Sequence, residues 1–246
     1  MVNLFSAIGD FSSFFFRSVF IPWQLRQTRY RIIREVYEVG INSLPIILII
    51  AAFVGLVSIV QTSYQVAGSM PRYILGATVS RMVMIELGPI LTALMVSGRC
   101  ASSMAAEIGT MRVTEQIDAL EIMAIDPYRF LNLPRIVGTF IALPVLTVIA
   151  EFDALFVSAA YAHYFLDIPF SVFNYGLTHF FFARDFFGGL VKSLFFSVVI
   201  ATSGCYFGFK VRGGAREVGR AATYAVVTAS ILVLLLDFLV ALVIFG

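Results

Sequence analysis

Long apolar runs separated by short polar stretches make up most of the chain from about residue 40 onward. A helix that crosses a bilayer needs roughly 20 mostly apolar residues, and about five stretches meet that requirement. They are about 41–60, 74–96, 136–161, 190–209 and 222–245. The stretch 165–187 is rich in aromatic residues but contains Pro169, so we expect a loop with short interfacial helices there. The pattern predicts an all-α integral membrane protein with about five transmembrane helices.

The first 39 residues have a different pattern. Polar residues recur there at alternating spacings of three and four, at Asn3, Ser6, Asp10, Ser13 and Arg17. This spacing places them on one face of a helix, with apolar residues elsewhere around it. We expect an amphipathic helix that lies in the membrane interface, and a short packed helix is the alternative. The sequence therefore divides into an interfacial helix with its lead-in, 1–39, and a transmembrane domain, 40–246.

Composition and charge give the expected location and orientation. The chain is 60% hydrophobic and 13% charged, whereas soluble domains have about 45–50% apolar and about 25% charged residues. Of the 17 Lys and Arg residues, 13 fall on the side of the predicted helices that holds the N-terminus. Because cytosolic loops are enriched in Lys and Arg, we expect a cytosolic N-terminus and a periplasmic C-terminus. A net charge of +2 gives no reason to expect a nucleic-acid partner.

Several ionisable side chains fall inside the predicted transmembrane helices. They are Arg81, Glu86, Glu151, Asp153, Lys192 and Asp237. Such groups cost roughly 2.5–3.5 kcal/mol each on insertion scales, so they are candidates for function. Lys192 is the natural counter-charge for Glu86 or Asp237, and these three residues lie at compatible depths in the outer half of the bilayer. The alternative is that the charged groups form ion pairs that only orient the helices.

The longest predicted cytosolic connection, 98–134, contains an amphipathic segment. Glu115, Asp118 and Glu121 recur every three residues and predict an acidic helical face beside an apolar strip of Ile117, Leu120 and Ala124. Helices that lie on a lipid surface favour Lys and Arg on their polar face, and the cytoplasmic leaflet is itself negative. The acidic face therefore favours docking on a partner protein, with a merely solvated helix as the alternative.

Two long motifs resemble the signature of a known family. The first runs from Glu86-Leu87-Gly88-Pro89 to Ser97-Gly98-Arg99, and the second runs from Ala105-Ala106-Glu107 to Asp118-Ala119-Leu120. Both are similar to the MlaE permease family, and the resemblance covers most of the chain from about residue 40. Ile85 stands where many relatives carry an arginine, and Arg81 lies one turn earlier.

The resemblance implies a function that composition alone does not. Permeases of this family are homodimers in bacterial MCE-type ABC transporters, where they move phospholipids or similar hydrophobic molecules between the inner membrane and a periplasmic MCE-domain protein. A separate ATPase binds the loop after the second helix, and in some systems a STAS-domain protein sits on the ATPase. The resemblance thus assigns Glu107, Glu115, Asp118 and Glu121 to ATPase coupling, and Glu86, Lys192 and Asp237 to the substrate cavity.

The sequence lacks a nucleotide-binding motif, as expected for a permease that depends on a separate ATPase. The sequence has no Gly-x-x-x-x-Gly-Lys-Ser/Thr phosphate loop, so ATP hydrolysis would occur on another chain. His163 and His179 do not have the spacing of a metal site, and we expect no metal or cofactor. Two alternatives remain: an intramembrane hydrolase that uses Glu86 and Glu151, and an ion-coupled carrier that works alone.

Overall fold

The computed structural model describes residues 9–10, 13–14, 25–66 and 71–246, and these residues contain five helices long and apolar enough to cross a membrane. The prediction of an all-α membrane protein with about five spans is therefore confirmed. The first span is built from α2 (Leu25–Gly40), the short 3₁₀ segment η2 (Ile41–Ser43) and α3 (Leu44–Val66). The predicted interfacial helix lies largely outside the described residues. Of that region, Phe14 is buried against the rings of Tyr128, Tyr206 and Phe209.

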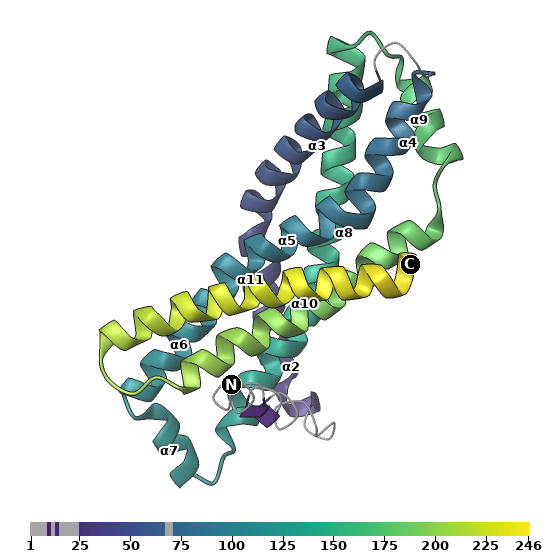
Figure 1. Cartoon of the computed structure of the whole chain (residues 1–246). Helices are drawn as coiled ribbons and strands as arrows, with labels where there is room; N and C mark the ends of the chain where they lie inside the picture. The colour runs from purple at the N-terminus through teal and green to yellow at the C-terminus, as the bar shows by residue number, and fades with distance from the viewer. Residues whose placement is uncertain (1–8, 11–12, 15–24, 67–70) are drawn as a thin grey trace.

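The second span is one long helix from Tyr73 to Val113 that contains two π-helical segments. Its parts are α4 (Tyr73–Met82), η3 (Val83–Leu87), α5 (Gly88–Val96), η4 (Ser97–Ala101) and α6 (Ser102–Val113). The helix changes direction between α4 and α5 (Figure 1). It then continues far past residue 96, so the predicted cytosolic loop 98–134 begins as a helix. Hydropathy detects only the apolar part of a helix, whereas the backbone hydrogen bonds continue into the polar part.

The remaining elements complete an all-helical architecture among the described residues. After α6 come α7 (Gln116–Ile122), the π-helical segment η5 (Tyr128–Asn132) and α8 (Leu133–Phe165). The predicted outer loop 162–187 holds one short helix, α9 (Phe170–His179), and is narrower than expected because α8 and α10 (Ala183–Phe209) extend into it. The last helix is α11 (Ala215–Phe245).

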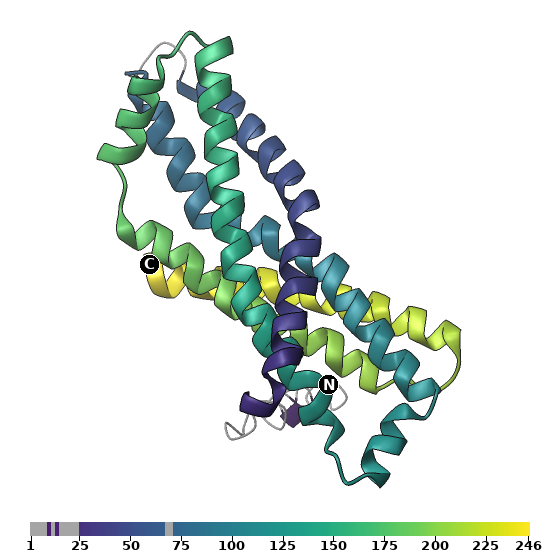
Figure 2. The same ribbon diagram turned by 180° about the vertical axis from the view of Figure 1, so that it is seen from behind.

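Two groups of helices cross each other. Helices α10 and α11 lie side by side and run across α3, α8 and α4, while α6 packs along both of them (Figures 1 and 2). Gly204 and Gly208 of α10 permit close contact with η4 and α6. A Cβ on Gly204 would lie 3.0 Å from the carbonyl oxygen of Ala101 in η4, and one on Gly208 would lie 2.7 Å from Cβ of Ile108 in α6. This pair of glycines therefore serves packing within the chain. Cys100 and Cys205 are free and buried.

Candidate functional site

Three ionisable side chains from three different spans meet at one point inside the protein. Lys192 of α10 is fully buried, and its Nζ lies 2.7 Å from Glu86 Oε1 and 2.9 Å from Asp237 Oδ1. Glu86 belongs to η3 and remains partly exposed, and Asp237 belongs to α11 and is mostly buried. The structure thus brings together the three residues that the sequence analysis selected. We call Glu86, Lys192 and Asp237 the ionic triad.

The π-helical segment that carries Glu86 has a local cause in the sequence. Pro89 has no backbone N–H, so it cannot donate the usual hydrogen bond to the carbonyl of Ile85. The helix instead widens to a π-helix over Val83–Leu87 before α5 begins. Such π-bulges occur frequently at functional sites because they change the direction of a side chain without ending the helix.

Arg81 does not join the ionic triad. Its Nε donates a hydrogen bond of 2.8 Å to Asp185 Oδ2, and its guanidinium lies 5.2 Å from the centre of the Phe182 ring. Asp185 is buried in the first turn of α10 and was not selected from the sequence. Asp185 is an acidic residue within the aromatic stretch that precedes the fourth predicted span. That position is the signal that could have identified Asp185 as a partner of Arg81. The pair ties α4 to the N-terminal end of α10.

The two acids of α8 lie apart from the triad lysine. Glu151 is buried, and neither of its carboxyl oxygens has a hydrogen-bond partner among the described residues. The side chain packs on Gly88, where an added Cβ would lie 2.6 Å from Glu151 Cγ. Asp153 is partly exposed, and its buried Oδ2 has no hydrogen-bond partner within the described part of the chain. No cluster of three or more metal-binding side chains occurs in the described residues.

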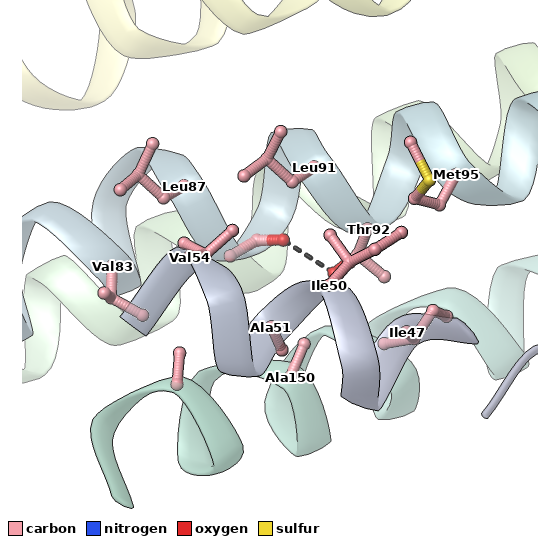
Figure 3. Close-up of a pocket in the computed structure, with 12 residues that line it drawn as sticks. Ile47, Ile50, Ala51, Val54, Val83, Leu87, Leu91, Thr92, Met95 and Ala150 are labelled. Atoms are coloured by element: carbon pink, nitrogen blue, oxygen red, sulfur yellow. Dashed lines mark hydrogen bonds between the residues drawn. The ribbon is translucent and has the colours of Figure 1, made fainter. Parts of the chain in front are cut away.

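A small apolar pocket between α3, α5 and α8 lies beside this region. Figure 3 shows Ile50 and Val54 of α3 facing Leu87 and Leu91, with the Thr92 hydroxyl donating a hydrogen bond of 2.7 Å to the Gly88 carbonyl oxygen. The pocket has a volume of about 20 Å³. That volume is enough for about one water molecule and far too small for a lipid chain. It is a packing gap rather than a substrate site.

The segment after the second span differs in detail from the predicted amphipathic helix. Helix α7 contains Asp118 and Glu121, but Glu115 precedes it in the left-handed conformation with φ of 59°. Ala124, with φ of 56°, also lies outside the helix and is exposed, so its place on the apolar strip was wrong. The sequence could not reveal these turns because neither residue is a glycine, which adopts positive φ most readily.

The charges of this segment are partly paired within the chain. Asp118 Oδ1 accepts a hydrogen bond of 2.6 Å from Arg112, and Glu107 Oε2 accepts one of 2.8 Å from the buried Arg135. Arg135 Nε also lies 3.6 Å from Glu35 Oε1, so α2, α6 and α8 are joined at one point. No ion pair of Glu115 or Glu121 occurs within the described ranges.

The apolar residues of α7 divide between packing and exposure. Ile117 is buried, and Leu120 packs against the same cluster as Ile108 and Tyr206. The two residues at the C-terminal end, Ile122 and Met123, are 87% and 61% exposed. The sequence analysis did not select this apolar pair, although its position directly after Glu121 was an available signal. Two adjacent exposed apolar side chains on a polar segment are a candidate for a docking surface.

Five membrane-length helices, with a buried ionic triad joining three of them, define a multi-pass membrane protein of the transport class. The family model described as Permease MlaE matches residues 32–243. The chain belongs to the MlaE permease family, as its motifs predicted.

Named relatives agree with this assignment. A protein of Rickettsia felis named as a probable ABC transporter permease is 35% identical, over 97% of this chain and 92% of its own length. A probable ABC transporter permease of Synechocystis is 36% identical, over 87% of this chain and 82% of its own length. The intermembrane phospholipid transport system permease protein MlaE of Haemophilus influenzae is 30% identical, over the whole of this chain and 95% of its own length.

Proposed function

We propose that the chain is the membrane-spanning subunit of an ATP-driven transporter that moves phospholipid between the bacterial inner membrane and a periplasmic MCE-domain protein. The observation that carries the proposal is the family match over residues 32–243, which includes every member of the ionic triad. A relative of nearly equal length that the chain matches throughout is named for intermembrane phospholipid transport.

In this proposal the ionic triad holds the lipid headgroup. Lys192 supplies a positive charge for a phosphate, while Glu86 and Asp237 keep that charge paired in the absence of lipid. Glu86 is the partly exposed member, so the triad is open to a ligand on the side of Glu86. Two acids and one lysine leave a net charge of −1 when all three are ionised, and such a charge needs contact with water or a polar ligand inside a membrane.

The partners follow from two exposed surfaces. The exposed acids Glu115 and Glu121, with Ile122 and Met123 beside them, form the proposed docking surface for the ATPase. Helix α11 exposes a row of large apolar side chains, among them Ile231, Leu235 and Phe238. We assign part of that row to a homodimer contact, which would place two copies of the ionic triad in one transporter.

The experiment that tests the function is reconstitution. The chain, purified in mild detergent with its native partners, should carry an ATPase and transfer a fluorescent phospholipid from vesicles to the MCE-domain protein only when ATP is hydrolysed. Transfer by the single chain, driven by an ion gradient without any ATPase, would instead establish the ion-coupled carrier. Release of a cleaved product would establish the hydrolase.

The proposed orientation places the N-terminus and α7 in the cytosol and α9 and the C-terminus in the periplasm. Its basis is the distribution of Lys and Arg, 13 of 17 on one side. We predict that Asn174→Cys and Gly246→Cys react with a membrane-impermeant thiol reagent added outside intact cells, whereas Thr114→Cys does not. The native Cys100 and Cys205 are buried and should give little background. Labelling of residues 174 and 246 only after permeabilisation would reverse the topology.

A further inference from the structure

The aromatic segment 162–187, to which neither the family motifs nor the ionic triad gives a role, forms one wall of a cavity of about 790 Å³. The opposite wall is the outer half of α8. Helix α9 lies near the outer end of α8, at the end of the molecule opposite α7 (Figures 1 and 2). The main lining residues are apolar: Phe152, Leu155, Phe156, Phe173, Leu177 and Phe186.

Close packing holds α9 in place against α4. A Cβ on Gly176 would overlap the Tyr73 carbonyl oxygen, and one on Gly76 would overlap the Phe173 carbonyl oxygen, so the two helices touch through backbone. The Tyr73 ring also stacks on Phe180 with a centroid distance of 5.9 Å. Phe173 is buried as a result. The cavity is therefore a preformed space with a fixed wall rather than a gap beside a loose loop.

The cavity opens onto the lipid-facing surface of the protein. Phe152 and Phe156 line it and are 68% and 73% exposed, and Val145 continues the same apolar surface toward the other end of α8. Between Glu151 and Ala159 the cavity follows α8 for about 12 Å, at 1.5 Å per residue. Its volume falls within the roughly 300–1,000 Å³ of small-molecule sites. In a bilayer, an apolar space open on this side is filled by hydrocarbon.

Three polar side chains line this space: Glu151 on α8, and Ser171 and Asn174 at the edge formed by α9. Ser171 and Asn174 lie on α9, are exposed and line the cavity, and both can donate and accept hydrogen bonds. An apolar chamber with a polar edge matches an amphiphile with a hydrocarbon chain and a polar glycerol region. None of the three triad residues lines the cavity, but Met84 does, and Met84 lies in the same π-helical segment as Glu86.

We propose that this cavity binds one acyl chain of an outer-leaflet phospholipid, whose glycerol region lies at Ser171 and Asn174, as a lipid site separate from the ionic triad. The assignment to the outer leaflet rests on the proposed function and its topology, while the acyl-chain site itself rests on the cavity. A lipid held here contacts Met84, which is two positions before Glu86, the acid that we assign to headgroup binding.

The test uses the complete complex in nanodiscs of phosphatidylethanolamine and phosphatidylglycerol that contain a phospholipid with a photoreactive acyl chain. After illumination, peptides that contain 152–159 and 170–177 should carry the lipid. Ala159→Phe fills the cavity and should lower this labelling by at least about tenfold, equivalent to about 1.4 kcal/mol of binding. The matched control is Ala160→Phe, which adds the same ring one residue away, at a position that does not line the cavity.

A second pair of variants guards against misfolding, because both changes lie on the surface of α9. Ser171→Trp covers the polar edge and should reduce labelling, whereas Thr178→Trp, also exposed but outside the cavity, should not. Equal labelling in Ser171→Trp and Thr178→Trp, or in Ala159→Phe and Ala160→Phe, would overturn the site. Absence of ATP-driven transfer with labelling intact would refute the transport function alone.

Discussion

Replacing Lys192 by methionine should reduce ATP-driven phospholipid transfer to background. The substitution keeps an unbranched side chain one atom shorter than lysine but leaves Glu86 and Asp237 without the cation that lies 2.7 Å and 2.9 Å from them. Removing one partner of a buried ion pair costs roughly 3–5 kcal/mol, because the remaining charge stays buried and uncompensated. The transfer rate and the thermal unfolding temperature of the purified complex are the measurements.

A neutral triple variant separates a transport role from a structural one. Lys192→Met combined with Glu86→Gln and Asp237→Asn leaves no net charge in the triad, and neutral replacements of buried ion pairs are often as stable as the original. We expect this variant to regain most of its thermal stability and its assembly with the ATPase while transfer stays at background. Recovery of transfer in the triple variant would show that the ion pairs only orient the helices. Wild-type transfer by Lys192→Met would remove the triad from the mechanism.

Reversing the charges of Glu115, Asp118 and Glu121 to lysine should release the ATPase from the purified complex. Placing like charges against each other across an interface costs several kcal/mol, so we expect at least about a hundredfold loss of affinity. The exposed Ile122 and Met123 should contribute to the same surface. The measurement is recovery of the ATPase with the tagged permease, compared with the amount of permease in the membrane.

Two control variants show whether loss of the ATPase is specific to the acids at 115, 118 and 121. Glu217→Lys changes a partly exposed acid, paired with Arg220 near the N-terminal end of α11 and on the same predicted side of the membrane, and should leave ATPase recovery unchanged. Exchanging Arg112 and Asp118 preserves their ion pair and the net charge but reverses the charge at position 118, so a loss of ATPase in that variant shows that the position of the negative charge matters and not the net charge alone. If the triple reversal retains the ATPase at the wild-type level, docking lies elsewhere.

Hydropathy predicted the membrane-crossing part of each long helix because burial in lipid demands a continuous apolar run. It could not predict that the second helix continues to Val113, since the polar end of a helix outside the membrane has no such signature. The ionic triad could be assembled from sequence because an intramembrane charge is expensive and must find a partner. The Arg81–Asp185 pair could not, because the expected span began after Asp185 and that residue was assigned to a loop.

Helices α4 to α6 form one continuous helical rod, which changes direction between α4 and α5. It reaches from the proposed lipid cavity beside α9 to the segment just before α7. From Glu86 to Val113 the rod extends 27 residues, or about 40 Å at 1.5 Å per residue. Two π-helical segments interrupt it, one at the triad and one at Ser97–Ala101. Because the helical backbone is stiff between these segments, we expect a displacement of α7 by the proposed ATPase to reach Glu86 through α6 and α5, with bending concentrated at Ser97–Ala101. The two π-helical segments divide this long helix into three α-helical parts, α4, α5 and α6, so the positions of these segments decide where the helix can change direction.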